Sequence, residues 1–201
     1  MITFVCVKVG SKYGPEYVNR LRRMIKVNYE GEHKFICLTD DRAGLTTAWT
    51  PVGTDLPGWW AKLILFKPHP ALVGRVIYMD LDTVIAGNID WLADYRGLFC
   101  ILRDFYQPTG WGSAIMSFQA GCHPEVWSHH TIQAIEHFTG DQDWIKAHIG
   151  KADIWQDLFP GKIGSYKADK LQDGPGKFSI VCFHGEPRPH EVGGWVTDVW
   201  H

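Results

Sequence analysis

Apolar and polar positions alternate along this chain in two ways. Continuous apolar runs, each as long as a buried strand, occupy residues 2–9, 34–41, 75–82, 98–104, 113–118 and 178–183. Segments with helical apolar spacing, or with proline at one end, predict helices over residues 15–29, 59–68, 124–138 and 141–149. Residues 42–58 are rich in Thr, Gly and Pro and predict a long surface loop. Strands that alternate with helices indicate an α/β fold with a mostly parallel central sheet flanked by helices.

The composition is typical of an ordinary soluble domain. With 201 residues, we expect a single domain over 1–201. The net charge of -2 gives no electrostatic reason to expect nucleic acid or an anionic membrane as a partner. No apolar run is long enough for a membrane span, and no signal peptide follows Met1. These features predict a cytoplasmic protein.

The cysteines do not form a recognisable metal or disulfide motif. There are five, and no two of them have the spacing of a CxxC pair. Cys6, Cys37 and Cys182 lie within apolar strand-like runs, so we expect buried free thiols.

Two carboxylates, Asp80 and Asp82, end the apolar run at 75–82. Residues two apart on a strand point the same way, with Cα atoms about 6–7 Å apart. At an effective dielectric near 20, two like charges at that distance repel by roughly 2 kcal/mol. A divalent cation such as Mn²⁺ or Mg²⁺ would offset this repulsion. The structural alternative is a pair of aspartates that caps the turn after the strand.

His184 ends a second apolar strand, at residues 178–183, and Gly185 follows it directly. If the two strands are near one another, the His184 imidazole becomes a third ligand beside the carboxylates. The alternative is a hydrogen-bonded structural histidine at a strand end.

Other polar residues also have both a structural and a functional interpretation. Asp141, in the segment "GDQDW", is either the N-cap of the helix at 141–149 or a contact to sugar hydroxyls. Lys62, Arg188 and His190 are either solvated or placed to stabilise the negative charge of a diphosphate.

The order of these motifs resembles one enzyme family, the retaining glycosyltransferases of family 8, which have the GT-A fold. The family pattern is a basic residue on a helix, Asp-x-Asp after an apolar strand, a "NAG"-like strand start, a "DQD" segment and a late His-Gly-Lys-Pro loop. The chain has in this order the segments "WWAKL", "VIYMDLDTV", "WGSAIM", "GDQDW" and "FHGEPRPH". The resemblance spans nearly the whole chain and implies a GT-A-type nucleotide-diphospho-sugar transferase.

The resemblance also implies ligands and roles. It implies a uridine diphosphate sugar as donor, Mn²⁺ or Mg²⁺ as the metal, and a sugar, a lipid-linked glycan or a protein as acceptor, with retention of the anomeric configuration. The implied metal ligands are Asp80, Asp82 and His184. The implied catalytic residues are Asp141, Gln142 and Lys62. The implied donor contacts are Tyr13, Lys62, Asp80, Leu81, Asp82, Gly185 and Arg188.

The chain departs from the family pattern in two places. Gly112 stands where the family has the asparagine of "NAG", so an amide expected to contact donor or acceptor is missing. The loop from His184 to its basic residue is two residues shorter than usual, and Arg188 replaces the family's lysine.

Two other functions fit parts of the sequence. The segment "DLDTV" matches the Asp-x-Asp motif of haloacid-dehalogenase-type phosphohydrolases, with Asp80 as nucleophile. That motif normally follows the first strand, whereas here it follows the third. A non-catalytic nucleotide-sugar-binding module is the other alternative, favoured by the tryptophans and the missing amide at Gly112.

Overall fold

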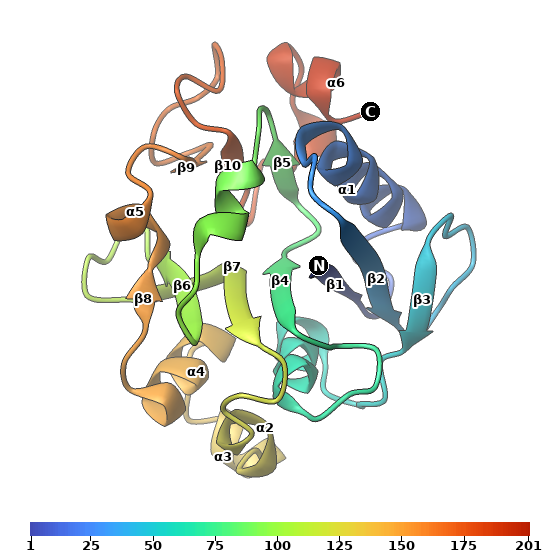
Figure 1. The fold of residues 1–201 in the computed structure, drawn as a ribbon, viewed down its shortest axis with the longest axis vertical. Coiled ribbons are helices and arrows are strands. Elements are labelled where there is room, and N and C mark those ends of the chain that lie inside the picture. Colours follow the sequence, from blue (N-terminus) through green and yellow to red (C-terminus); the bar gives the residue numbers. More distant parts are fainter.

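A seven-stranded sheet forms the centre of the molecule, with the strand order β3-β2-β1-β4-β7-β6-β8 (Figure 1). The computed structural model describes all residues from 1 to 201. The strands of this sheet are β1 (Ile2–Lys8), β2 (His33–Thr39), β3 (Ala48–Pro51), β4 (Arg75–Met79), β6 (Phe99–Arg103), β7 (Trp111–Gln119) and β8 (Asp153–Ile154). A second sheet has the order β5-β10-β9, formed by β5 (Thr83–Ile85), β10 (Ile180–Cys182) and β9 (Ile163–Ser165).

The helices are short except for the first. The α-helices are α1 (Pro15–Asn28), α2 (Glu125–Ser128), α3 (Ile132–Ile135), α4 (Asp141–Ile149), α5 (Trp155–Leu158) and α6 (Trp195–Val199). The 3₁₀ helices are η1 (Gly58–Phe66), η2 (Asp90–Asp94) and η3 (Pro189–Glu191). None of them combines the length and the apolar character that a membrane span requires.

The predicted mostly parallel sheet is confirmed. β1 pairs in parallel with β2 and β4, β2 with β3, and β6 with β8. Only β7 runs in the opposite direction, antiparallel to both of its neighbours, β4 and β6. The carboxyl ends of β1, β4 and β6 therefore meet the start of β7 at one edge of the sheet.

Each face of the main sheet carries its own hydrophobic core, because side chains alternate along a strand. On β4, Ile77 and Met79 pack into the core covered by α1, α6 and the small sheet. Val76 and Tyr78 pack into the core covered by η1, α2, α3 and α4. Figure 1 shows α1 and α6 at one end of the molecule, and α2, α3 and α4 at the other.

Helix α1 follows the predicted pattern closely. Pro15 occupies its first turn, where the missing N–H carries no penalty, and Gly14 precedes it. Tyr17, Leu21 and Ile25 form its buried stripe. The predicted buried thiols are also confirmed, because Cys6, Cys37 and Cys182 are buried and all five cysteines are free.

The strand predicted over 75–82 ends as β4 at Met79, and residues 80–83 form a turn in which the N–H of Thr83 donates to the carbonyl oxygen of Asp80 at 3.1 Å. Asp80 and Asp82 therefore do not share a strand face as their spacing predicted.

Three further predicted elements differ from the structure. The segment 42–58 is not all loop, because Ala48–Pro51 forms edge strand β3, which the sheet tolerates even with a terminal proline. The helix predicted over 124–138 is broken into α2 and α3, since Thr131 is extended and its side chain accepts the N–H of Ala134 at 3.0 Å. The helix predicted over 59–68 is the 3₁₀ helix η1.

Candidate functional site

A cavity of about 510 Å³ opens at the carboxyl ends of β1, β4 and β6, beside the start of β7 and α4. Nine of the ten predicted site residues line it: Tyr13, Lys62, Asp80, Leu81, Asp82, Asp141, Gln142, His184 and Gly185. The tenth, Arg188, lies nearby, with its guanidinium 5.4 Å from the centre of the Tyr13 ring. Segments far apart in the sequence are thus brought to one place, as expected for the carboxyl edge of an open α/β sheet.

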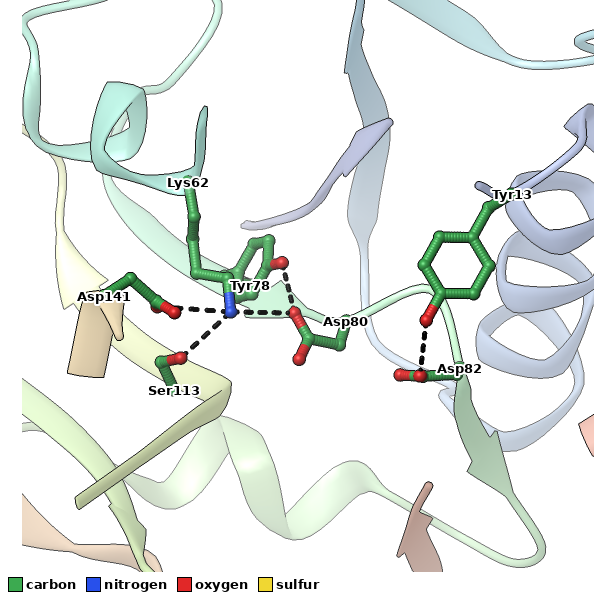
Figure 2. A network of polar contacts seen from close by, with 7 residues as sticks. All are labelled: Tyr13, Lys62, Tyr78, Asp80, Asp82, Ser113 and Asp141. Carbon is green, nitrogen blue, oxygen red and sulfur yellow. Dashed lines mark hydrogen bonds and ion pairs between the residues drawn. The ribbon is translucent and has the colours of Figure 1, made fainter. Parts of the chain in front are cut away.

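Lys62 is at the centre of a buried polar cluster (Figure 2). Its ammonium Nζ lies 3.0 Å from Oδ1 of Asp80 and 3.3 Å from Oδ2 of Asp141. It also donates a hydrogen bond of 2.9 Å to Oγ of Ser113, and it lies 5.2 Å from the centre of the Tyr78 ring. The solvated alternative for Lys62 is therefore wrong, because only 5% of the residue is exposed.

The neighbouring carboxylates keep Lys62 protonated. Burial disfavours an ammonium ion, but Asp141 and Asp80 outweigh this effect and raise the pKa of Lys62. The site therefore keeps a permanent buried cation at neutral pH.

Asp141 does not cap α4. The N-cap is Gly140, and the Asp141 carboxylate is directed to Lys62 from the first position of the helix. Burial raises the pKa of Asp141 against the opposing charge of Lys62. Gln142, the next residue, is half-buried and lines the cavity.

Asp82 has a different environment from Asp80. Tyr13 donates a hydrogen bond of 2.7 Å to its Oδ2, and no lysine or arginine forms an ion pair with it. Burial, followed by repulsion from Asp80, raises the pKa of Asp82 from 3.8 to about 6. Burial and the charge of Asp82 in turn raise the pKa of Tyr13 well above its ordinary value.

Sequence reasoning missed two members of the cluster. The Tyr78 hydroxyl donates a hydrogen bond to Oδ1 of Asp80, from the same strand two residues earlier. The i, i+2 spacing contained this signal, because such residues share a face of the strand. Ser113, by contrast, lies on β7 and contacts Lys62 of η1 only through the tertiary fold, and no local pattern indicates that contact.

His184 lies in the cavity wall but is not in a preassembled ligand cluster. Its Nε2 is 2.7 Å from Oγ of Ser165, and its ring stacks on Phe105 with centroids 5.7 Å apart. Burial, assisted by Lys167, lowers the pKa of His184, which favours the neutral imidazole. As the side chains lie, no three His, Cys, Asp or Glu residues are close enough to hold a metal ion together.

The charges of the site nevertheless suit a divalent cation. Asp80, Asp82 and Asp141 carry three negative charges when ionised, and Lys62 compensates one of them. The hydrogen bond between Nε2 of His184 and Oγ of Ser165 resembles the second hydrogen bond that orients metal-binding histidines. With Nε2 engaged in this way, Nδ1 is the ring nitrogen that can bind a metal ion. Carboxylate oxygens and one imidazole nitrogen are donors that Mn²⁺ accepts.

Comparison with known proteins identifies the fold. No protein-family model matches the chain, and no curated protein sequence matches it significantly. Among solved structures, galactosyltransferase LgtC, in complex with donor and acceptor sugar analogues, aligns over 98% of this chain and 94% of its own, with TM-score 0.67 and 12% identity.

Two further glycosyltransferases align equally well with this chain. GlyE of Streptococcus pneumoniae has TM-score 0.66 and 14% identity, and the bifunctional WbbM has TM-score 0.68 and 11% identity. Each alignment covers 98% of this chain, which spans 58% of the GlyE chain and 48% of the WbbM chain. The comparisons do not favour the phosphohydrolase or the binding module. The chain has the GT-A fold of these glycosyltransferases, as its sequence motifs predicted.

Proposed function

We propose that this protein is a metal-dependent glycosyltransferase that moves a sugar from a uridine diphosphate donor to a sugar, a lipid-linked glycan or a protein, with retention of configuration. One observation carries the proposal. In a GT-A fold, the cavity at the carboxyl edge of the sheet is lined by four carboxylates and two lysines, which leaves two negative charges for a metal–diphosphate complex to complement. The carboxylates are Asp80, Asp82, Asp104 and Asp141, and the lysines are the exposed Lys12 and the buried Lys62.

Asp80, Asp82 and His184 would hold the Mn²⁺ or Mg²⁺ ion. When bound, such an ion acts as a Lewis acid toward the diphosphate oxygens, which is worth several kcal/mol as negative charge develops on the leaving group. Asp82 suits this role because it lacks a cationic partner within the protein, and burial already disfavours its free charge.

The other residues bind and orient the donor. Tyr13 and Arg188 stand together beside Asp82, and they would contact the nucleotide and its phosphates. The permanent cation of Lys62 stabilises negative charge that develops during departure of the nucleotide. Asp141 and Gln142, at the start of α4, would face the transferred sugar. An outgoing phosphate oxygen accepts the proton of the acceptor hydroxyl, so the site needs no strong base.

Thermal unfolding with a uridine diphosphate sugar and MnCl₂ tests the proposal. We expect the pair to raise the Tm of the wild-type protein, and Asp82→Ala to abolish that shift. Asp198→Ala, at an exposed position of α6, is the matched control and should keep the shift. A full shift in Asp82→Ala would contradict the proposal.

A turnover assay separates the alternatives. Release of uridine diphosphate from a panel of donor sugars, dependent on Mn²⁺, supports a transferase. Release of phosphate from p-nitrophenyl phosphate would instead indicate a phosphohydrolase. Donor binding with no turnover under any condition would indicate a binding module.

A further inference from the structure

The two most exposed aromatic rings of the molecule both line the candidate cavity. Trp59 is 56% exposed and Tyr106 is 61% exposed, and each contributes to the cavity wall. The next most exposed aromatic residue, Trp49, is 40% exposed, lies elsewhere on edge strand β3, and is covered by the guanidinium of Arg42 at 5.0 Å. Uncovered aromatic surface is thus concentrated at the one cavity that holds the charged cluster.

The two rings approach the cavity from different elements. Trp59 lies on η1 three residues before Lys62, and residues i and i+3 of a 3₁₀ helix share a face. Tyr106 lies in the loop between β6 and β7 and packs edge-on against His184, with centroids 5.5 Å apart. The two rings therefore flank the cavity, one on the Lys62 side and one on the His184 side.

The loop that carries Tyr106 is held in place by a carboxylate. Oδ1 of Asp104 accepts the backbone N–H groups of Tyr106 at 2.7 Å and Gln107 at 2.8 Å. Both bonds end on Oδ1, so Oδ2 of Asp104 is available to a ligand in the cavity that this residue also lines. Gln142 adds an amide to the same cavity.

Flat apolar faces beside hydrogen-bonding groups are suited to a pyranose ring, which has an apolar face and a rim of hydroxyls. We propose that Trp59 and Tyr106 form a carbohydrate-binding subsite for the acceptor, which makes the acceptor a glycan. This inference rests on the proposed function, since the donor must occupy the Asp82 side of the same cavity.

The observations favour a glycan over other occupants. In the proposed function the nucleotide would contact Tyr13, which lies on the Asp82 side of the charged cluster. A second copy of the chain or another apolar surface would leave Oδ2 of Asp104 and the side-chain amide of Gln142 without hydrogen-bond partners. A sugar can pack its apolar face on the two aromatic rings and form hydrogen bonds to these polar groups through its hydroxyls.

Saturation-transfer NMR with lactose, maltotriose, cellotriose and chitotriose tests the inference on the full chain with Mn²⁺ and uridine diphosphate. We expect at least one saccharide to bind, and Trp59→Ala and Tyr106→Ala each to weaken it by about tenfold or more. Trp59→Phe should restore most of the binding, and Trp49→Ala, the matched control, should leave it unchanged.

The outcomes separate this inference from the proposed function. No binding by any saccharide, or binding that survives both alanine variants, overturns the subsite. If the nucleotide sugar raises the Tm of the wild-type protein while either result holds, only the subsite fails. Saccharide binding that depends on both rings, in a protein that no nucleotide sugar stabilises, supports the subsite and overturns the proposed donor.

Discussion

The two sides of the candidate cavity differ in how their charges are compensated. On one side, the carboxylates of Asp80 and Asp141 contact the buried ammonium of Lys62 at 3.0 and 3.3 Å. On the other side, Asp82 has a phenol hydroxyl as its partner and no cation in ion-pair contact. The carboxylates on the Lys62 side thus have a cationic partner within the protein, whereas the Asp82 carboxylate has none in ion-pair contact.

The comparison explains how one site serves both stability and binding. A buried ion pair with both partners present is close to neutral for stability, but removal of one partner leaves an uncompensated charge. An already uncompensated carboxylate has the opposite property, because its removal relieves a penalty. Substitutions on the two sides should therefore change stability in opposite directions.

The largest effect is expected for Lys62→Met. It leaves the buried Asp141 and the partly exposed Asp80 without their cation and should lower the free energy of unfolding by about 3–5 kcal/mol. Urea unfolding monitored by tryptophan fluorescence measures this change. Adding Asp141→Asn should recover part of the loss, because one uncompensated carboxylate is then removed. A loss below about 1 kcal/mol would contradict the charge compensation described for Lys62.

On the other side, Asp82→Asn should stabilise the metal-free protein at pH 7 by about 1–3 kcal/mol. The pKa of Asp82 in the folded protein is raised from 3.8 to about 6. The protonated carboxyl therefore contributes its full stabilisation below pH 3.8, and this stabilisation is lost as the pH rises through 6. The gain from Asp82→Asn should therefore shrink as the pH falls from 7 to 4. Unfolding curves across this range measure it.

Asp80→Asn is the matched comparison for that experiment. It removes a partner of Lys62, and we expect it to destabilise the protein at pH 7. The same sign for Asp80→Asn and Asp82→Asn would show that the two carboxylates do not differ as described.

Tyr13→Phe should have a smaller effect, a loss of about 1–2 kcal/mol in the free energy of unfolding. The variant removes the hydroxyl that donates to Asp82, which otherwise lowers the pKa of Asp82. The pKa of Asp82 should therefore rise further, and a pH titration followed by carboxyl NMR measures this rise. Tyr106→Phe, at an exposed hydroxyl, is the control, and an unchanged Asp82 pKa in Tyr13→Phe would refute the contact.

The smallest effect is expected for Ser113→Ala, a loss of about 0.5–1 kcal/mol. Lys62 loses a neutral hydrogen-bond acceptor but keeps both carboxylates. Thermal unfolding beside Ser128→Ala, an exposed serine on α2, measures this difference. A loss as large as that of Lys62→Met would place Ser113, and not the carboxylates, at the centre of the cluster.

Long elements and the residues at their ends could be predicted from the sequence. α1 and α4 have clear local signals, and the apolar strand β4 ends at Met79, directly before the turn that carries the two aspartates of the candidate site. The short elements β5, β8, β9, α5 and α6 were missed. They are two to five residues long and carry no measurable periodicity, so tertiary pairing and packing form them.

The sequence by itself determined the α/β fold and the residues available to the site, because apolar periodicity and the Asp80–Asp82 spacing are local properties of the chain. Only the tertiary structure decided which carboxylates pair with Lys62 and which one has no cationic partner. That choice depends on two tertiary contacts. Helix α4 packs on η1 and β7, which places Asp141 and Ser113 beside Lys62, and β1 pairs with β4, which places Tyr13 beside Asp82. Electrostatic compensation depends on distance in space and on burial, and neither can be read from separation along the chain.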